Sequence, residues 1–354
     1  MDRRHFLAGG LAVPFAIEAR AAAPPQPIFI GDMHTHLFFF GPKSASSHPL
    51  GKSMTAGNAT LVSWALVGDV PWLRLVRGGF KQSGDPKAGQ PVTWFYQELD
   101  RIKRHIAEQG LKIVRGPGDI DRALQGERHV VLSVEGATFL DDGLDNGLAE
   151  LQHAYDLGVR QIQLVHYIRN SIGDFQTEPP EHNGLTALGK KVVAECNRLG
   201  ILIDLAHCTP QAVRDALAVS KVPVVWSHSS VTRAGTPNWQ LPVWQARQLS
   251  LEGAKAITTA GGVVGLWALS ADVGRTVSSY ADRLLEMADW LGYDHVAFGS
   301  DMNALANPAI AGFTDLRRVV QLLEQRKVAE MSIRKLAMEN YVRVLRGAFE
   351  SRRA

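Results

Sequence analysis

The chain has 354 residues, of which 45% are hydrophobic and 21% charged, an ordinary globular balance. Its net charge of +3 is too small to argue for binding to nucleic acid or to a membrane surface. The length allows one large barrel or two smaller domains, and the even spread of predicted strands favours one barrel.

The N-terminal segment has the pattern of an export signal. Arg3 and Arg4 precede an apolar stretch that runs to Ile17, and Ala19-Arg20-Ala21 offers a small-x-small cleavage site. Paired arginines of this kind predict twin-arginine export, cleavage near Ala21, and a periplasmic or secreted protein. The stretch is shorter than the roughly 20 residues of a membrane-spanning helix, so no transmembrane segment is expected.

Eight short apolar runs bounded by turn signals predict eight buried strands. In chain order they are PIFIGDMHTH, LVSWALVG, VVLSVEG, IQLVH, ILIDLAH, PVVWSH, GVVGLW and HVAFGSD. Helical periodicity is found near residues 92–110, 144–157, 186–199, 210–219, 243–260, 277–291 and 311–349. Because strands alternate with helices, we expect a parallel sheet closed into a TIM-like (β/α)8 barrel of the metal-dependent hydrolase type.

The barrel is predicted as a single catalytic domain over residues 22–354. Loop insertions are expected near 41–58 and 81–91, where Gly, Ser, Lys and Pro are frequent. Loops of this length are usually functional, so each could cover the barrel mouth as a lid, although passive surface insertions are an equal alternative.

Most of the predicted strands end in a side chain suited to metal binding or acid–base chemistry. These residues are His34, His36, Glu135, His166, His207, His228 and Asp301. In a barrel of parallel strands the chemistry is located at the C-terminal strand ends. The pattern therefore predicts one site built from several strands.

The types of these residues predict a centre with two divalent ions, for which Zn2+ is the expected metal. His34 and His36 are two apart on a strand, so both point to the same side and can reach one ion. His207 and His228 follow neighbouring strands and can share a second ion. Glu135 lies between the two pairs and has two oxygens, so it can bridge both ions.

Two further residues are candidates for catalysis. Asp301 can take a proton from the attacking water or bind a metal itself. His166 can donate a hydrogen bond to the oxygen of the scissile carbonyl, with a purely structural role as the alternative. Cys196 and Cys208 are expected to be buried free thiols.

At these residues the chain resembles the membrane dipeptidase (renal dipeptidase) family of the amidohydrolase superfamily. The likeness runs from about residue 28 to 347 and is carried by VVLSVEGA, QLVHYIRN, ILIDLAHCT, PVVWSHSS, DHVAFGSDMN and ENYVRVL. The resemblance implies a zinc-dependent dipeptidase that attacks a peptide bond with a metal-bridging hydroxide. It also implies that Glu135 bridges the ions, His166 contacts the substrate carbonyl, and Asp301 handles the proton.

The chain departs from the family pattern in two places. The family usually has His-x-Asp at the end of the first strand, and here the third residue is His36. The family also places an Arg before an Asn in the loop after His228, where an arginine is expected to bind the substrate carboxylate. The corresponding stretch here is Thr236-Pro237-Asn238, so Arg233 is the candidate substitute.

Two alternatives to a dipeptidase stay open on the sequence. One is another hydrolase of the superfamily, acting on a lactone, an amide or an organophosphate. The other is a metal-binding barrel without turnover, which the retained Asp301 disfavours because a structural metal site needs no proton carrier. In each enzymatic case the expected partner is a small-molecule substrate, with a homo-oligomer possible.

Overall fold

The computed structural model describes residues 27–36, 49–76, 79–141, 144–233 and 235–352. The predicted export signal at residues 1–21 lies outside the described residues, as do residues 41–48 of the first predicted insertion.

Eight parallel strands form the centre of the molecule, and each overlaps one of the predicted apolar runs. The overlap is least complete at β7, which begins three residues before the predicted run IQLVH. In hydrogen-bonded order they are β1 (Ile30–Thr35), β2 (Ala59–Val67), β6 (His129–Glu135), β7 (Val159–Gln163), β8 (Leu202–Asp204), β9 (Val225–Trp226), β10 (Val263–Leu266) and β11 (Val296–Phe298). The last strand returns to the first, because the Asp301 N–H donates to the His34 carbonyl (3.0 Å) and the His36 N–H to the Met302 carbonyl (2.9 Å). The predicted TIM-like barrel is therefore confirmed.

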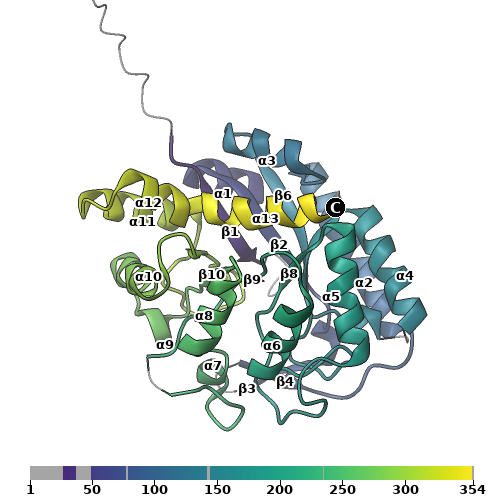
Figure 1. Cartoon of the computed structure of the whole chain (residues 1–354). Coiled ribbons are helices and arrows are strands. Elements are labelled where there is room, and N and C mark those ends of the chain that lie inside the picture. The colour runs from purple at the N-terminus through teal and green to yellow at the C-terminus, as the bar shows by residue number, and fades with distance from the viewer. Residues whose placement is uncertain (1–26, 37–48, 77–78, 142–143, 234, 353–354) are drawn as a thin grey trace, which may run out of the picture.

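Helices surround this barrel (Figure 1). They are α1 (Leu50–Gly57), η1 (Val70–Trp72), α2 (Gln90–Glu108), α3 (Pro117–Leu124), η2 (Thr138–Leu140), α4 (Leu144–Leu157), α5 (Ala187–Leu199), α6 (Pro210–Val219), α7 (Val243–Ala246), α8 (Leu251–Thr259), α9 (Ser270–Val273), α10 (Val277–Leu291), α11 (Phe313–Gln325), α12 (Glu330–Arg334), η3 (Lys335–Glu339) and α13 (Asn340–Ser351). Three short strands lie off the barrel order: β3 (Leu73–Val76), β4 (Gly79–Gln82) and β5 (Lys112–Ile113).

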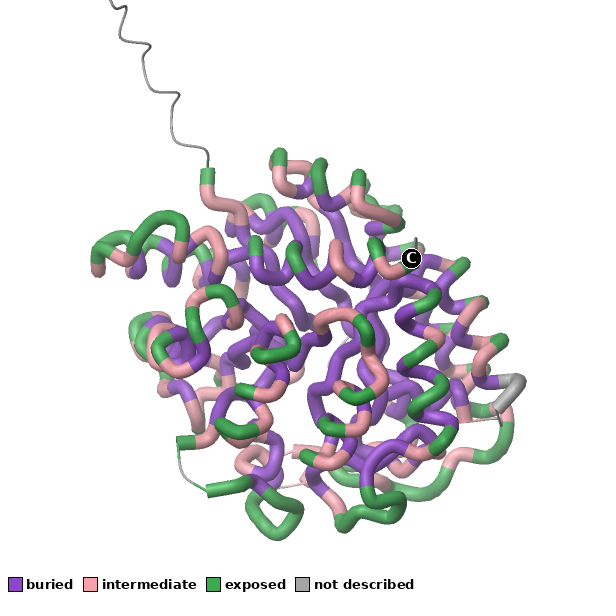
Figure 2. Tube along the Cα trace, viewed as in Figure 1, coloured by how far each residue is buried: buried purple, intermediate pink, exposed green. Residues whose placement is uncertain are grey.

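The helices bury one face and expose the other, as their periodicity predicts (Figure 2). Several begin where a hydroxyl caps the first turn: the Thr186, Thr209 and Ser250 side chains each accept a backbone N–H of the helix that follows. Helix α13 covers the N-terminal end of the barrel. There the hydroxyl of Tyr341, which lies on α13, donates to the side chain of Gln161 on β7 (2.8 Å). The opposite end is left for the functional site.

Three segments differ from the sequence-based expectation. The predicted loop 41–58 contains helix α1, because Leu50 and Met54 lie one turn apart and are both buried. The predicted loop 81–91 begins inside β4, which pairs with β3 in an antiparallel hairpin. The predicted helix 243–260 is two helices, α7 and α8. It is interrupted because the Leu249 N–H donates to the Ser230 carbonyl (2.8 Å) and the Thr232 N–H donates to the Leu249 carbonyl (2.9 Å).

Candidate metal centre and active site

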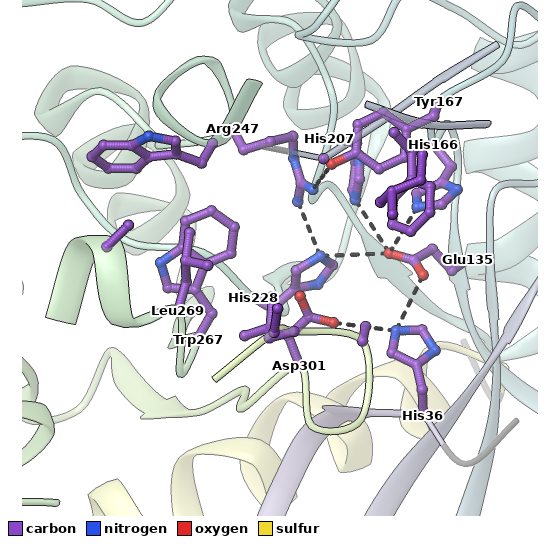
Figure 3. A pocket seen from close by; sticks show the side chains of 18 of the residues that line it. His36, Glu135, His166, Tyr167, His207, His228, Arg247, Trp267, Leu269 and Asp301 are labelled. Carbon is purple, nitrogen blue, oxygen red and sulfur yellow. Dashed lines mark hydrogen bonds and ion pairs between the residues drawn. The ribbon is translucent and has the colours of Figure 1, made fainter. Parts of the chain in front are cut away.

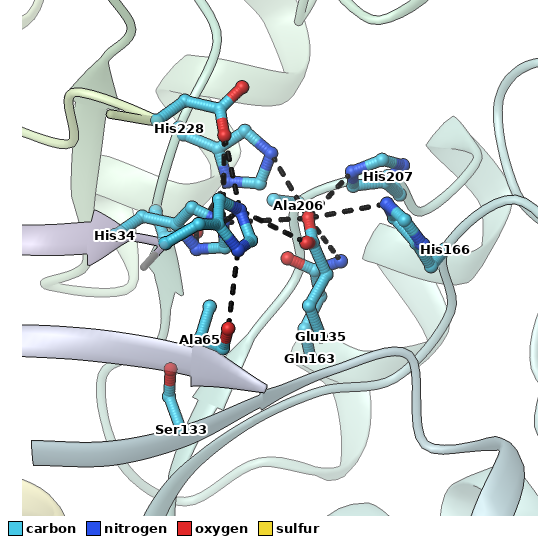
Figure 4. A network of polar contacts seen from close by, with 12 residues as sticks. His34, Ala65, Ser133, Glu135, Gln163, His166, Ala206, His207 and His228 are labelled. Atoms are coloured by element: carbon cyan, nitrogen blue, oxygen red, sulfur yellow. Dashed lines mark hydrogen bonds and ion pairs between the residues drawn. The ribbon is translucent and has the colours of Figure 1, made fainter. Parts of the chain in front are cut away.

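The structure brings the seven predicted strand-end residues together in one buried cluster at the C-terminal end of the barrel (Figures 3 and 4). Glu135 is the last residue of β6, and His166, His207, His228 and Asp301 lie two or three residues beyond their strands. Because strands β6 to β11 are parallel and in order, their C-terminal ends converge on the same opening.

The Glu135 carboxylate lies within 3.5 Å of Nε2 of all four histidines predicted to bind metal, and Figure 4 shows it between His34 and His228 on one side and His166 and His207 on the other. Nε2 of His36 is 3.3 Å from Glu135 Oε2, and Nε2 of His34 is 3.5 Å from Oε1. Nε2 of His207 and of His228 lie 3.2 and 3.5 Å from the same Oε1. One oxygen therefore faces His36 and the other faces the remaining three histidines, so the carboxylate can contact two ions.

Asp301 completes the cluster from the side of the first pair. Its Oδ1 lies 3.2 Å from Nε2 of His36. Three overlapping triads have ligand atoms within 4.8 Å of one another: His34/His228/Asp301, His34/His36/Glu135 and Glu135/His207/His228. A mixed set of imidazoles and carboxylates in such triads suits Zn2+ and similar divalent ions.

The contacts of Nδ1 orient the rings of His34, His36 and His228 so that Nε2 points into the cluster. Nδ1 of His36 faces the Ala65 carbonyl at 3.2 Å, and since a carbonyl can only accept, Nδ1 carries the proton and Nε2 offers its lone pair. Nδ1 of His34 and Nδ1 of His228 both face the Ser227 hydroxyl, at 3.3 and 2.9 Å. The Nε2 atoms of His34 and His36 are only 3.0 Å apart, as two lone pairs aimed at one cation would be.

At Glu135, His207 and His228, the electrostatics of the cluster favour the protonation states that a metal needs. Burial holds the pKa of His207 and of His228 well below the usual value, and the positive charge of Arg247 adds to this effect. Burial alone would raise the pKa of Glu135, but the surrounding imidazoles hold it well below its usual range. An ionised Glu135 beside neutral His207 and His228 is the state in which these three groups bind a divalent ion. Burial alone would lower the pKa of His34, but the carboxylates of Glu135 and Asp301 raise it.

Two members of the cluster have an unusual backbone conformation. His207 has φ 70° and Asp301 has φ 54°, values in the left-handed region that residues other than glycine seldom adopt. Such conformations persist only where the surrounding structure holds them, and they concentrate at functional sites.

Asp69 belongs to the site, although the sequence reasoning missed it. Its Oδ1 accepts from Nδ1 of His166 (2.7 Å), and its Oδ2 accepts the Tyr167 backbone N–H (3.1 Å). Asp69 lies two residues beyond β2, so the same strand-end pattern that pointed to the other seven could have found it.

Arg233 does not lie where the predicted binding of the substrate carboxylate would require it. Its side chain is 55% exposed and pairs with Glu286 at 2.7 Å, and it is not among the described residues that line the pocket. Arg247 occupies the pocket instead. It is buried, donates from Nη1 to the Tyr167 hydroxyl (3.1 Å) and from Nη2 to Nε2 of His228 (2.9 Å).

A sequence signal for Arg247 existed. Arg247 is followed by the carboxamide residue Gln248, much as the family pattern has an Arg before an Asn, and it comes just before the Ser250 cap of α8. The helical periodicity of residues 243–260 concealed this, because Arg247 falls in the gap between α7 and α8.

A pocket of about 580 Å³ opens over the cluster. Its floor carries the charged and imidazole side chains, and its walls come from the β3–β4 hairpin, from α7, and from the segments that follow β10 and β11. Among the described residues, no helix is both long and apolar enough to cross a membrane.

Comparison with known proteins agrees with this geometry. The sequence model of the family described as "Membrane dipeptidase (Peptidase family M19)" matches residues 61–354. The chain is 27% identical to dipeptidase tcpJ of Claviceps purpurea over 315 residues, which cover 86% of this chain and 70% of that protein.

Solved structures share the fold. A crystal structure of a dipeptidase described as a metallopeptidase of family M19 superposes with a TM-score of 0.74 at 23% identity, covering 92% of this chain and 99% of the other. A metallopeptidase from Rhodobacter sphaeroides, bound to a phosphinate mimic of the dipeptide L-Ala-D-Ala, superposes with a TM-score of 0.71 at 22% identity, covering 91% and 100%.

Proposed function

This chain belongs to the membrane dipeptidase family, peptidase family M19, and on this basis we propose that it hydrolyses dipeptides with two divalent metal ions, Zn2+. The observation that carries the proposal is the position of the Glu135 carboxylate within 3.5 Å of Nε2 of all four histidines, with Arg247 in the same pocket. A dinuclear hydrolytic centre beside a buried cation fits a substrate that has both a scissile amide and a free carboxylate.

His34 and His36 would hold one ion, His207 and His228 the other, and Glu135 both. When bound, the ions supply an activated water as the nucleophile and stabilise the charge that develops on the carbonyl oxygen. The departure from His-x-Asp to His34-Thr35-His36 keeps a ligand at this position, since Nε2 of His36 points at Glu135 and Asp301.

Asp301 is the proton carrier in this proposal. Its carboxylate lines the pocket and lies within 3.2 Å of Nε2 of His36, so it can accept a proton from the water and deliver it to the leaving amine. No other carboxylate among the described pocket residues is available for this, because Glu135 is enclosed by the histidines.

His166 is the candidate hydrogen-bond donor to the carbonyl oxygen. Burial would lower its pKa, but the carboxylates of Asp69 and Glu135 outweigh burial and raise it. A raised pKa favours the imidazolium, which carries a proton on Nε2 as well as on the Nδ1 that faces Asp69. Nε2 can then donate to the oxygen that becomes negative during attack.

Arg247 is the candidate receptor for the substrate carboxylate. Its Nε is buried and has no hydrogen-bond partner among the described residues. Its Nη2 donates to Nε2 of His228, the atom that would bind a metal ion. With a metal bound there, Nη2 would lose this acceptor and could donate to the substrate instead. Two donors on one edge of a guanidinium can bind a carboxylate with two parallel hydrogen bonds. This favours a dipeptide over an uncharged lactone or organophosphate.

The test compares three substrates with the zinc-loaded protein: a free dipeptide, the same dipeptide amidated at its C-terminus, and a lactone. We expect the free dipeptide to be cleaved best. Arg247→Ala should raise its KM about tenfold or more, because a charge-assisted hydrogen bond contributes roughly 1.5–3 kcal/mol. Arg233→Ala, which removes an exposed arginine, is the matched control and should leave KM unchanged.

The proposal fails if amidated and free dipeptides are cleaved equally, or if the lactone is the better substrate. Arg247→Lys gives a second variant that keeps the charge, in case the alanine variant does not fold. It should show an intermediate KM because lysine cannot form the two parallel bonds.

The proposed location is the periplasm, on the strength of Arg3, Arg4 and the small-x-small site at residues 19–21. Replacing both arginines with lysine should retain the uncut chain in the cytoplasm of a host with a twin-arginine pathway. Export that is unaffected by this change would contradict the twin-arginine route.

A further inference from the structure

We propose that the preferred substrates are dipeptides whose C-terminal residue has a large apolar side chain, which the aromatic wall beside Arg247 receives. We define this wall by Phe80, Tyr167, Trp244 and Trp267, all of which line the pocket. This inference rests on the dipeptidase function proposed above and adds the class of side chain that the site selects.

The first argument is the chemistry of the pocket walls. Among the described lining residues, every charged side chain belongs to the floor: Glu135, Asp301 and Arg247. The remaining walls are aromatic or aliphatic, apart from the phenol of Tyr167 and the floor histidines. A charged or amide side chain pushed against these walls would lose its water without gaining a partner, whereas an apolar one is stabilised by leaving water.

The second argument is where the wall lies relative to Arg247. The guanidinium carbon is 5.6 Å from the centre of the Tyr167 ring and 5.8 Å from that of Trp267. The ring of Phe80 lies 5.9 Å from that of Tyr167. Trp244 is on α7, which ends at the residue before Arg247. The rings of Tyr167 and Trp267 therefore lie beside the cation that is proposed to hold the substrate carboxylate, and Phe80 extends the aromatic wall from Tyr167.

The covalent structure of a dipeptide explains why the apolar wall beside Arg247 would contact the side chain of the C-terminal residue. The C-terminal Cα is bonded both to the carboxylate carbon and to the scissile nitrogen. With the carboxylate on Arg247 and the scissile bond over Glu135, this Cα lies between them, and its side chain leaves the backbone on the Arg247 side. The side chain of the C-terminal residue is thus the one that meets the aromatic wall.

The aromatic wall is fixed by packing between the β3–β4 hairpin and α7. Gly79, at the start of β4, has φ +156°, and a Cβ there would lie 2.5 Å from Val243 Cγ1 of α7. The hairpin that carries Phe80 therefore packs directly on the helix that carries Trp244, in a way that only glycine permits. A cavity of about 580 Å³ with walls fixed in this way is of the size and character of a ligand pocket.

The wild-type enzyme tests the inference without any variant. Four dipeptides with N-terminal alanine are compared: Ala-Phe, Ala-Leu, Ala-Gly and Ala-Asp. We expect kcat/KM for Ala-Phe to exceed that for Ala-Gly by about tenfold or more, as burial of a large apolar side chain implies, with Ala-Asp the poorest. Equal values for Ala-Phe and Ala-Gly, or a preference for Ala-Asp, would overturn the inference. If no dipeptide is cleaved by the zinc-loaded protein, the proposed function itself is overturned along with it.

A matched pair of variants locates the preference. Phe80→Ala should bring the ratio of kcat/KM for Ala-Phe and Ala-Gly down toward one. Trp239→Ala removes an aromatic side chain that is 44% exposed and not among the described lining residues, and should keep the wild-type ratio. An unchanged ratio in a folded Phe80→Ala protein, judged by its metal content and circular dichroism, would contradict the assignment of the wall.

Discussion

Asp69 and His166 form a buried pair in which Oδ1 of the aspartate lies 2.7 Å from Nδ1 of the histidine, although the residues are 97 positions apart. Asp69 is fully buried, and its other oxygen accepts the Tyr167 N–H. The aspartate thus fixes both the orientation of the His166 ring and the segment that carries it.

Asp69→Asn should lower kcat by roughly 10–100-fold, the usual effect of losing an orienting carboxylate. The amide cannot support the imidazolium, so fewer molecules carry a proton on Nε2 of His166. The fall should be larger in kcat than in KM, and the metal content should stay at the wild-type value. Loss of metal in this variant would show that the pair supports the ions rather than the substrate carbonyl.

Ser227 connects the two histidine pairs. Its hydroxyl faces Nδ1 of His34 at 3.3 Å and Nδ1 of His228 at 2.9 Å, and it is also hydrogen bonded to the carboxylate of Asp204. Ser227→Ala should weaken metal binding by about 10–100-fold, measured by competition with a chromophoric chelator. Ser229→Ala is the control, because that buried hydroxyl bonds to Trp226 instead. Equal metal affinity of the two variants would rule out this orienting role.

Glu135→Gln should reduce the metal content more than any single histidine substitution. The neutral amide removes the negative charge that lies within 3.5 Å of all four Nε2 atoms of His34, His36, His207 and His228. Elemental analysis of the purified protein, before and after zinc addition, gives the number of ions per chain. A variant that keeps two ions and full activity would contradict the bridging position.

Asp301→Asn should lower kcat by about 10²–10⁴-fold while most of the metal stays bound, because a positioned general acid and base accelerates the reaction by about this factor. The comparison is kcat together with metal content on the same preparation. If kcat falls less than tenfold with both ions present, the proton is carried by another group.

Asp174 offers a test of stability that is independent of catalysis. Burial alone would raise its pKa, but the backbone N–H groups of Gly184, His182 and Glu181 donate to the carboxylate and lower the pKa overall. A pKa that is lower in the folded state stabilises the protein above the unfolded-state value of about 4, and this stabilisation is lost as the pH falls through the folded pKa.

Asp174→Asn should therefore lower the free energy of unfolding by about 1–2 kcal/mol at pH 7, because charge-assisted hydrogen bonds are replaced by weaker ones. The difference in the free energy of unfolding between the wild type and Asp174→Asn, measured by urea unfolding of the metal-free protein, should shrink between pH 5 and 3. Asp85→Asn, at an exposed position, should leave the free energy of unfolding unchanged at both pH values. A difference for Asp174→Asn that stays constant over this range would mean that the carboxylate charge does not cause the difference in stability.

The sequence alone was sufficient for the barrel and for most of the candidate site. Buried strands of a parallel barrel are continuous apolar runs, so all eight are visible locally, and the residue that ends each run must lie at the same end of the barrel. That is why His34, Glu135 and His207 could be grouped without coordinates. The buried free thiols Cys196 and Cys208 were also predicted correctly.

The tertiary structure decided the features that depend on contacts between distant segments. The periodicity of residues 243–260 is that of one helix, yet the backbone bonds between Leu249 and the segment after β9 interrupt it and turn Arg247 into the pocket. Arg233, closer in sequence to His228, is drawn outward by Glu286. Local patterns determine which face of a strand or helix is buried, but which arginine reaches the site depends on hydrogen bonds between residues that only the closed barrel brings together.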